Sequence, residues 1–145
     1  MKVCTFFGHR DTPESVMVLI REVLIELIEH EKSVRFLVGS EGSFDKMVTK
    51  VLKELMSVYR NIECDIVVAY LDGKNRELLF ENTVFPEGLE CVPKKFAIEY
   101  RNRWMLKQSD YIVAYVNRPF GGAAKFVELA EKQNITVINL AKQKT

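Results

Sequence analysis

The sequence predicts an α/β domain in which a parallel β-sheet is covered by helices on both faces. Two observations support this fold class. Runs rich in β-branched and aromatic residues alternate with stretches whose apolar residues recur every three or four positions, as in strands and amphipathic helices. Such alternation favours parallel strands joined by right-handed crossovers. Glycine or small polar residues also follow three of the expected strands, which places three loops at one edge of the sheet.

Length and composition point to one domain spanning residues 1–145. With 48% hydrophobic and 28% charged residues, the chain is large enough for one substantial core and too short for two. Its formal net charge of +1 provides no broad basic field. This balance argues against a nucleic-acid or membrane partner held by bulk electrostatics.

The sequence shows neither a membrane segment nor an export signal. No apolar run approaches membrane-spanning length, and the N-terminus lacks a basic stretch followed by an apolar run. We therefore expect a cytoplasmic protein. The three cysteines, Cys4, Cys64 and Cys91, show no paired spacing, so we expect neither a disulfide framework nor a metal site. We expect no cofactor either.

The first half of the chain repeats the order strand, loop, helix. A first strand is expected over residues 2–7, followed by a loop and a helix with Thr12 as its N-cap and Pro13 at its first position. A second strand over residues 34–38 ends in a Gly-Ser-Glu-Gly-Ser loop, after which apolar residues recur at helical spacing from Phe44 to Tyr59. A third strand is expected over residues 65–70.

The second half begins with the stretch that is hardest to interpret, residues 71–95. Asp-Gly and Pro-Glu-Gly turn signals in it predict an irregular excursion, either a lid or an interface arm. A helix is then expected over residues 95–108, a strand over 111–116, a helix ending near Lys132 and a last strand over 136–140.

The stretch from 111 to 128 carries the clearest sign of a binding site. Its strand runs into a Pro-Phe-Gly-Gly loop and then into an apolar 3.6-residue period, so a helix begins at two adjacent glycines. Gly121 and Gly122 would let a ligand approach the main chain, and a helix N-terminus favours an anion such as phosphate. Glu128 follows about 9 Å along the helix axis, within reach of a nucleotide sugar. Alternatively, the glycines are turn geometry and Glu128 is solvated.

A return of the chain past its first strand gives the strand order 3-2-1-4-5, a Rossmann-like, three-layer arrangement. The order reverses between strands one and four, and ligands of such sheets bind at the carboxyl ends of the strands beside that switch point. Loops 8–10, 39–43 and 117–122 meet there. The candidate ligand-binding residues of the first two loops and the following helix are Gly8, His9, Arg10, Gly39, Ser40, Gly42 and Asp45.

Several of these side chains also have a purely structural interpretation. His9 is either a proton donor or a residue that fixes its loop through the ring nitrogens. Arg10 either binds phosphate or caps a helix end, and Asp45 either holds ribose hydroxyls or complements a helix dipole. Trp104 either stacks on a base or packs against a neighbouring element. Arg103 and Arg118 are expected at the surface or, alternatively, in contact with a second phosphate.

Four motifs fall at the expected site or on the helix before the fourth strand. They are Gly8-His9-Arg10, the run VGSEGSFD over residues 38–45, the run YRNRWM over residues 100–105, and Gly121-Gly122 with Glu128. Together they resemble the SLOG superfamily, which includes the LOG cytokinin-activating phosphoribohydrolases and the DNA-processing protein DprA. The resemblance covers nearly the whole chain and is closest to the small, uncharacterised YspA/YpsA-like branch of bacterial and phage proteins. It implies a Rossmann-like, nucleotide-binding domain.

The LOG enzymes carry a Gly-Gly-x-Gly-Thr-x-x-Glu run that binds phosphate and ends in an acid needed to cleave the N-glycosidic bond. Gly121, Gly122 and Glu128 match this run, whereas Ala124 stands in place of its third glycine and Lys125 in place of its threonine. The resemblance therefore implies phosphate binding by the glycines, with the Lys125 ammonium as a substitute for the lost hydroxyl.

An Arg-Lys pair lies upstream of that run in LOG enzymes. Arg101 matches the arginine, and Asn102 replaces the lysine. If the protein cleaves a nucleotide, the resemblance makes Glu128 and Arg101 the catalytic residues, with the carboxylate stabilising an oxocarbenium-like state and the guanidinium holding the phosphate or the departing base.

Two functions follow from this sequence. The first is a binding module or sensor that captures a nucleotide or nucleotide-derived ligand; the alternative is a LOG-like nucleotide N-glycosidase. The altered Ala124 and Lys125 positions favour the first. A DprA-like contact with single-stranded DNA is disfavoured by the charge balance and by the absence of interleaved basic and aromatic residues. The resemblance also implies a homo-oligomer, for which Phe120 and Trp104 would suit either an interface or the core.

Overall fold

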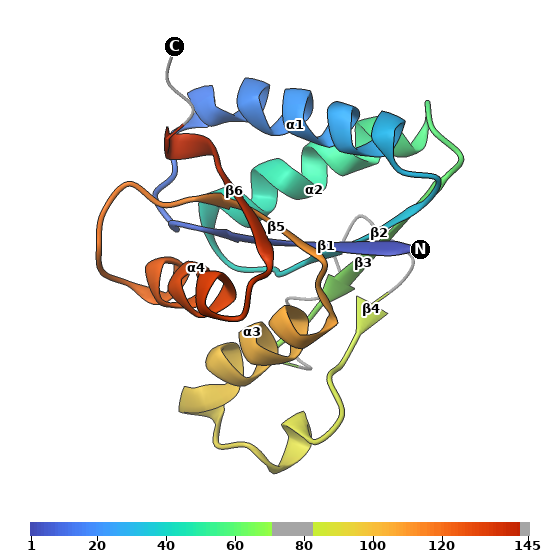
Figure 1. Cartoon of the computed structure of the whole chain (residues 1–145). Coiled ribbons are helices and arrows are strands. Elements are labelled where there is room, and N and C mark those ends of the chain that lie inside the picture. Colours follow the sequence, from blue (N-terminus) through green and yellow to red (C-terminus); the bar gives the residue numbers. More distant parts are fainter. Residues whose placement is uncertain (71–82, 143–145) are drawn as a thin grey trace.

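The computed structural model describes residues 1–70 and 83–142 (Figure 1). Short 3₁₀ turns precede α1 and α3 and follow β6. The strands are β1 (Lys2–Gly8), β2 (Val34–Val38), β3 (Ile62–Val67), β4 (Thr83–Val84), β5 (Tyr111–Tyr115) and β6 (Thr136–Asn139), and the helices are α1 (Met17–His30), α2 (Gly42–Met56), α3 (Ala97–Gln108) and α4 (Gly122–Lys132).

The strands described form one parallel sheet with the order β4-β3-β2-β1-β5-β6. The predicted order is confirmed for the five expected strands, and so is the switch point, which lies between β1 and β5. In the β1–β5 register, Thr5 lies opposite Ile112 and Gly8 opposite Tyr115. The end of β1 and the end of β5 are therefore level with each other.

The expected irregular excursion over 71–95 contains an element that the sequence prediction lacked. The two-residue strand β4 pairs with β3 at the edge of the sheet, and short 3₁₀ turns at Leu89–Cys91 and Lys94–Phe96 lead to α3. The part of the excursion from 71 to 82 lies outside the described residues, so the interpretation of that part as a lid or an arm stays a prediction.

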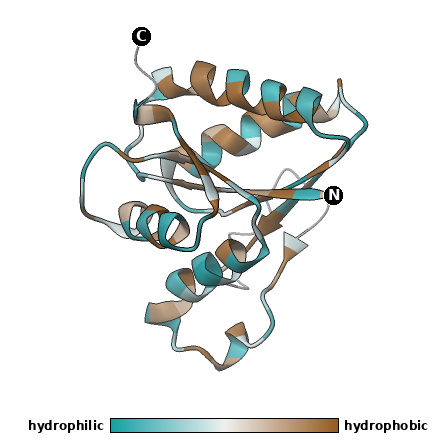
Figure 2. Ribbon diagram, viewed as in Figure 1, coloured by the Kyte–Doolittle hydropathy of each residue, from teal (hydrophilic) through white to brown (hydrophobic). Residues whose placement is uncertain are grey.

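Two helices cover each face of the sheet, as the sequence predicts. Figure 1 shows α1 and α2 on one side, with α3 and α4 on the other. The alternation of side chains along β1 supplies both cores: Cys4 and Phe6 pack with α1 and α2, whereas Phe7 packs with α4. In Figure 2, hydrophobic residues run along the inner strands and alternate with hydrophilic ones on the helices, the pattern of a sheet buried between two helical layers.

Several element boundaries differ from the prediction, and two of the differences have a clear physical reason. Thr12 does not cap a helix, because its hydroxyl donates to the carbonyl of His9 and a 3₁₀ turn over Glu14–Val16 precedes α1. The hydroxyl thus closes a turn after β1 instead of accepting an N–H of a helix. The third strand starts at Ile62 instead of residue 65, because β2 begins at Val34 and its first residue pairs with Ile62.

The cysteines are free thiols, and two of them lie within strands. Cys4 and Cys64 are buried in β1 and β3, whereas Cys91 is exposed. Burial raises the pKa of the Cys64 thiol to about 12, so it packs as a small neutral hydrophobe. No helix within residues 1–70 and 83–142 is long and apolar enough to cross a membrane.

Candidate functional site

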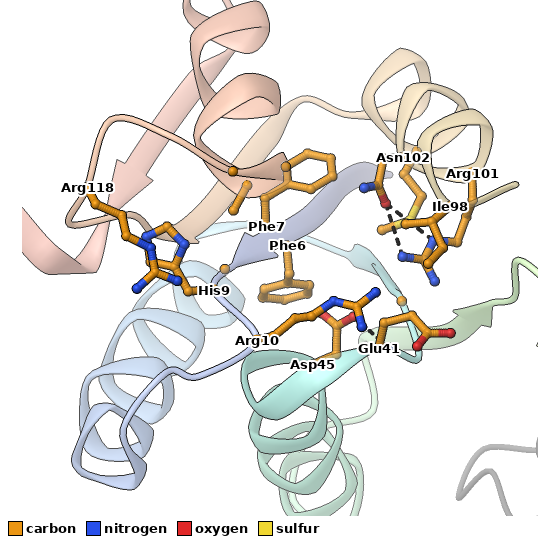
Figure 3. Close-up of a pocket in the computed structure, with 16 residues that line it drawn as sticks. Phe6, Phe7, His9, Arg10, Glu41, Asp45, Ile98, Arg101, Asn102 and Arg118 are labelled. Atoms are coloured by element: carbon orange, nitrogen blue, oxygen red, sulfur yellow. Dashed lines mark hydrogen bonds between the residues drawn. The ribbon is translucent and has the colours of Figure 1, made fainter. Parts of the chain in front are cut away.

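A cavity of about 390 Å³ opens at the carboxyl ends of β1, β2 and β5. Its position is the switch point of the sheet, where ligands of doubly wound folds bind. Figure 3 shows its side chains converging from both faces of the sheet. The lining consists of Phe6, Phe7, Gly8, His9, Arg10, Gly39, Glu41, Asp45, Ile98, Arg101, Asn102, Met105, Arg118, Gly121, Gly122 and Ala123.

Arg101 is the most unusual of these residues because it is a buried cation. Only 3% of its surface is exposed, although arginine is rarely buried without a partner. Its Nε and Nη2 donate to the Asn102 side-chain oxygen at 3.3 and 3.2 Å, whereas its buried Nη1 has no hydrogen-bond partner among the described residues. Burial lowers the pKa of Arg101, and the nearby charges of Asp45 and Glu41 oppose that shift. The guanidinium of this lining residue therefore keeps one buried donor without a hydrogen-bond partner among the described residues.

Asp45 supplies a buried carboxyl group to the same cavity. It lies in the first turn of α2, and its Oδ2 accepts the Glu41 backbone N–H at 3.1 Å. Burial raises the pKa of Asp45 to about 6, against the opposing effect of the Arg101 charge. This carboxyl group thus titrates close to neutral pH, which is a property of groups at functional sites.

The N-terminus of α4 opens onto the cavity through its glycines. Gly121, which precedes the helix, has a φ of 101°, a conformation that favours glycine, and no side chain caps the helix there. A Cβ on Gly122 would meet nothing within 4 Å, so packing does not require glycine at that position. The first N–H groups of a helix have no partner within it, and those of Gly122 and Ala123 belong to residues that line the cavity.

His9 fixes the loops at the switch point, as one of its two sequence interpretations holds. Its Nε2 accepts the backbone N–H of Asn117 at 3.3 Å, which joins the loop after β1 to the loop after β5. Burial lowers the pKa of His9, the Arg118 charge lowers it further, and Asp11 opposes the shift. A neutral ring with Nε2 as acceptor fits this contact.

Arg10 reaches the cavity with its side chain and a helix end with its main chain, so phosphate binding by the guanidinium stays a prediction, and the helix contact is not the predicted one through side-chain donors. Its side chain lines the cavity, and in Figure 3 it extends towards Asp45 and Glu41. Its backbone carbonyl accepts the N–H of Ser43 at 2.9 Å, so its main chain satisfies one of the first N–H groups of α2.

Trp104 packs beside Leu37, Val67 and Met105, which favours packing over base stacking for this aromatic.

The cavity thus brings together a majority of the candidates from the sequence. Four candidates lie outside its lining: Ser40, Gly42, Lys125 and Glu128. Gly42 packs against the main chain of Arg10. Lys125 pairs with Glu99 of α3 on the surface. Glu128 is 69% exposed, pairs with Lys132 at 3.2 Å and borders a separate hollow near Asn139.

Two charged lining residues were not among the candidate ligand-binding residues. Glu41 lies in the loop after β2, where its position among small polar residues could have indicated it. Arg118 was expected at the surface or at a second phosphate; it lines the cavity and makes two hydrogen bonds to Asp11, at 2.8 and 3.2 Å. Its position directly after β5, at the switch point, is a signal that sequence reasoning could have used.

Comparisons with known proteins concern the fold. No known family model and no curated protein matches this sequence significantly. The structure is similar to DNA processing protein A (DprA) from Streptococcus pneumoniae, with a TM-score of 0.71 and 14% sequence identity over 94% of this chain. It is also similar to DprA from Helicobacter pylori, a protein described with a single-stranded DNA binding mode, with a TM-score of 0.67 and 13% identity over 94% of this chain.

The matched region covers 49% of the Streptococcus pneumoniae chain and 63% of the Helicobacter pylori chain. The present chain thus spans about half to two thirds of the length of these relatives. At such low sequence identity the likeness concerns the architecture of the chain. These comparisons therefore establish the fold of this chain: a Rossmann-like α/β fold similar to that of DprA.

Proposed function

We propose that this chain binds a phosphorylated nucleotide or nucleotide-derived ligand in the cavity beside β1 and β5, as a binding module or sensor. The observation that carries the proposal is the buried Arg101 guanidinium, which lines the cavity and keeps Nη1 without a partner among the described residues. A buried donor without a partner is costly, and a buried cation is more so. An anion bound beside Nη1 would remove that cost.

The N-terminus of α4 supports an anionic ligand independently of Arg101. Gly121, Gly122 and Ala123 line the same cavity, and a helix N-terminus combines free N–H groups with a favourable dipole for phosphate. The Asn102 side-chain oxygen accepts from Arg101, so its NH₂ group remains a donor. Donors from α3 and α4 thus share one cavity.

The size of the cavity supports a ligand larger than phosphate alone. Its volume of about 390 Å³ lies within the range of small-molecule sites. Glu128 is outside the lining, so no observation on this carboxylate favours cleavage of the ligand over binding. We therefore propose binding as the function and treat release of a free base as a separate measurement.

The test uses thermal unfolding of the purified protein with nucleoside mono- and diphosphates, cyclic nucleotides and ADP-ribose. A ligand that binds only the native state raises the unfolding temperature with its concentration. Arg101→Gln should abolish this rise, and its unfolding temperature without ligand is measured alongside, because the variant removes both a buried charge and the cation that opposes the burial penalty of Asp45. Chromatography of each mixture reports any free base.

The matched control is Arg103→Gln on the same helix. Arg103 is exposed and pairs with Glu99 at 3.5 Å, so its loss should leave the ligand-induced rise intact. The proposal fails if no compound of the panel stabilises the wild-type protein, or if Arg101→Gln and Arg103→Gln respond alike to a compound that does.

A further inference from the structure

We propose that Phe120 is the stacking platform for the base of the bound ligand, so that the ligand carries an aromatic ring beyond its phosphorylated sugar. The inference rests on the proposed function and adds to it the residue that contacts the base. Phe120 is an apolar side chain that is 67% exposed. Such exposure leaves part of the ring free to contact a ligand.

Phe120 is not itself part of the cavity lining, but its ring lies against Arg118, which is. Arg118, Gly121 and Gly122, which lie within two residues of it, all line the cavity. The loop that carries Phe120 therefore forms one wall of the site, directly before the N-terminus of α4.

The ring is held in place by a chain of two interactions. The Asp11 carboxylate accepts two hydrogen bonds from Arg118, at 2.8 and 3.2 Å, and the Arg118 guanidinium carbon lies 5.6 Å from the centre of the Phe120 ring. This distance is within the range of a cation–π contact. The guanidinium thus covers one face of the ring while most of its surface stays accessible, and a platform ordered before binding loses less entropy on contact with a ligand.

The cavity has an arginine on each of two opposite sides. Figure 3 shows Arg101 and Arg118 on opposite sides of it. A phosphate beside the buried Arg101 would leave the rest of the ligand to extend towards the Arg118 side, where Phe120 follows two residues later. Stacking on an aromatic side chain accepts any base, because every base has a π face. Phe120 should therefore distinguish ligands with a base from ligands without one, and not one base from another.

Phe96 provides a matched control for an exposed aromatic residue. It is 49% exposed, and the Lys95 ammonium lies 5.1 Å from the centre of its ring. Ile98, two residues after it, lines the cavity, whereas Lys95 does not. Phe96 thus shares the exposure of Phe120, but the cation on its ring comes from a residue outside the lining.

The experiment is calorimetric titration of AMP, GMP and ribose 5-phosphate into the wild-type protein and the variants Phe120→Ala, Phe120→Trp and Phe96→Ala. Phe120→Ala should weaken binding of AMP and GMP about five- to hundredfold, the range expected for loss of one base–aromatic stack. Binding of ribose 5-phosphate should change less than about twofold, because the sugar phosphate does not contact the ring. Phe120→Trp should retain AMP binding, and Phe96→Ala should behave as wild type.

The inference is overturned if Phe120→Ala leaves AMP binding unchanged, or weakens AMP and ribose 5-phosphate equally. In that case the binding function itself still stands, provided that ribose 5-phosphate binds the wild-type protein and Arg101→Gln abolishes that binding. If neither these three compounds nor any other compound of the thermal-unfolding panel binds the wild-type protein, the inference and the proposed function fail together.

Discussion

Asp45 and Arg101 both approach Gly39, from the two faces of the sheet. A Cβ on Gly39 would lie 2.7 Å from the Asp45 Oδ2 and 3.0 Å from the Arg101 guanidinium carbon. The carboxyl end of β2 can therefore pass between the two charged groups only as glycine. This contact connects the helix layer of α2 with that of α3 at the floor of the cavity.

Gly39→Ala should destabilise the protein and weaken ligand binding, because the added methyl group must displace Asp45 or Arg101. Overpacking of this kind costs about 1–3 kcal/mol. Urea unfolding measures the change in the free energy of unfolding, and titration with AMP measures the affinity for the ligand. Gly122→Ala is the control for stability, since a Cβ there meets nothing within 4 Å. A Gly39→Ala protein as stable as wild type would show that the two charged side chains are free to move apart.

Asp45→Asn should stabilise the protein at neutral pH. Burial raises the pKa of Asp45 from 3.8 to about 6, so the native state holds this proton more tightly than the unfolded chain. Stability therefore falls as the pH rises from about 4 to 6, and the cost is fully present above pH 6. At 1.36 kcal/mol per pKa unit, the asparagine should add about 2–3 kcal/mol at pH 7.5.

At pH 4 the same substitution should change the free energy of unfolding little, because the native carboxyl group is already neutral. Urea unfolding of both proteins at pH 4.0 and 7.5 gives the comparison. Equal effects at the two values of pH would mean that Asp45 does not titrate in this range.

His9→Gln should remove part of the acid sensitivity of the protein. The folded pKa of His9 lies below 6.5, so the unfolded chain binds the proton more readily. The stability that neutral His9 contributes is therefore present above pH 6.5 and is lost as the pH falls through the lowered folded pKa. Unfolding free energies at pH 7.5 and 5.5 should differ less in His9→Gln than in wild type. His30→Gln, at the exposed end of α1, is the control and should leave that difference unchanged.

Glu128→Gln should leave ligand binding unchanged. The Glu128 carboxylate is 69% exposed and pairs with Lys132 one helical turn away, and it does not line the cavity. Calorimetric titration of AMP should give the same affinity within about twofold, since substitutions at distant sites act independently. A large loss of affinity, or loss of a base-releasing activity present in the wild type, would place Glu128 at the ligand.

The sequence was sufficient for most of the fold because local signals agreed with the final topology. Val34–Val38 was predicted with its observed bounds, since a mostly apolar run there ends at Gly39. The strand β4 could not be found in this way. Two residues carry no periodicity, and Thr83–Val84 is a strand only because the edge of β3 lies beside it.

The sequence predicted the parts of the site that are formed by glycine-containing loops. The glycines at the ends of β1, β2 and β5 mark the switch point, and the motif around Arg101 indicated that residue. Side-chain direction was less accessible to sequence reasoning. Arg118 contributes because Asp11, from a distant loop, holds its guanidinium, and Glu128 lies outside the cavity because of the rotation of α4 about its own axis. Both depend on tertiary placement that no local pattern encodes.

The walls of the cavity come from both ends of the chain, since residues 6–10 and 39–45 face residues 98–105 and 118–123 across the β1–β5 junction. During synthesis the N-terminal segments leave the ribosome first. A nascent chain that already contains β1, β2 and α2 has Asp45 in place but lacks both Arg101 and the N-terminus of α4. The proposed ligand would therefore find a complete site only when β5 has inserted beside β1, and its binding would stabilise the contact between the early and late parts of the folding chain.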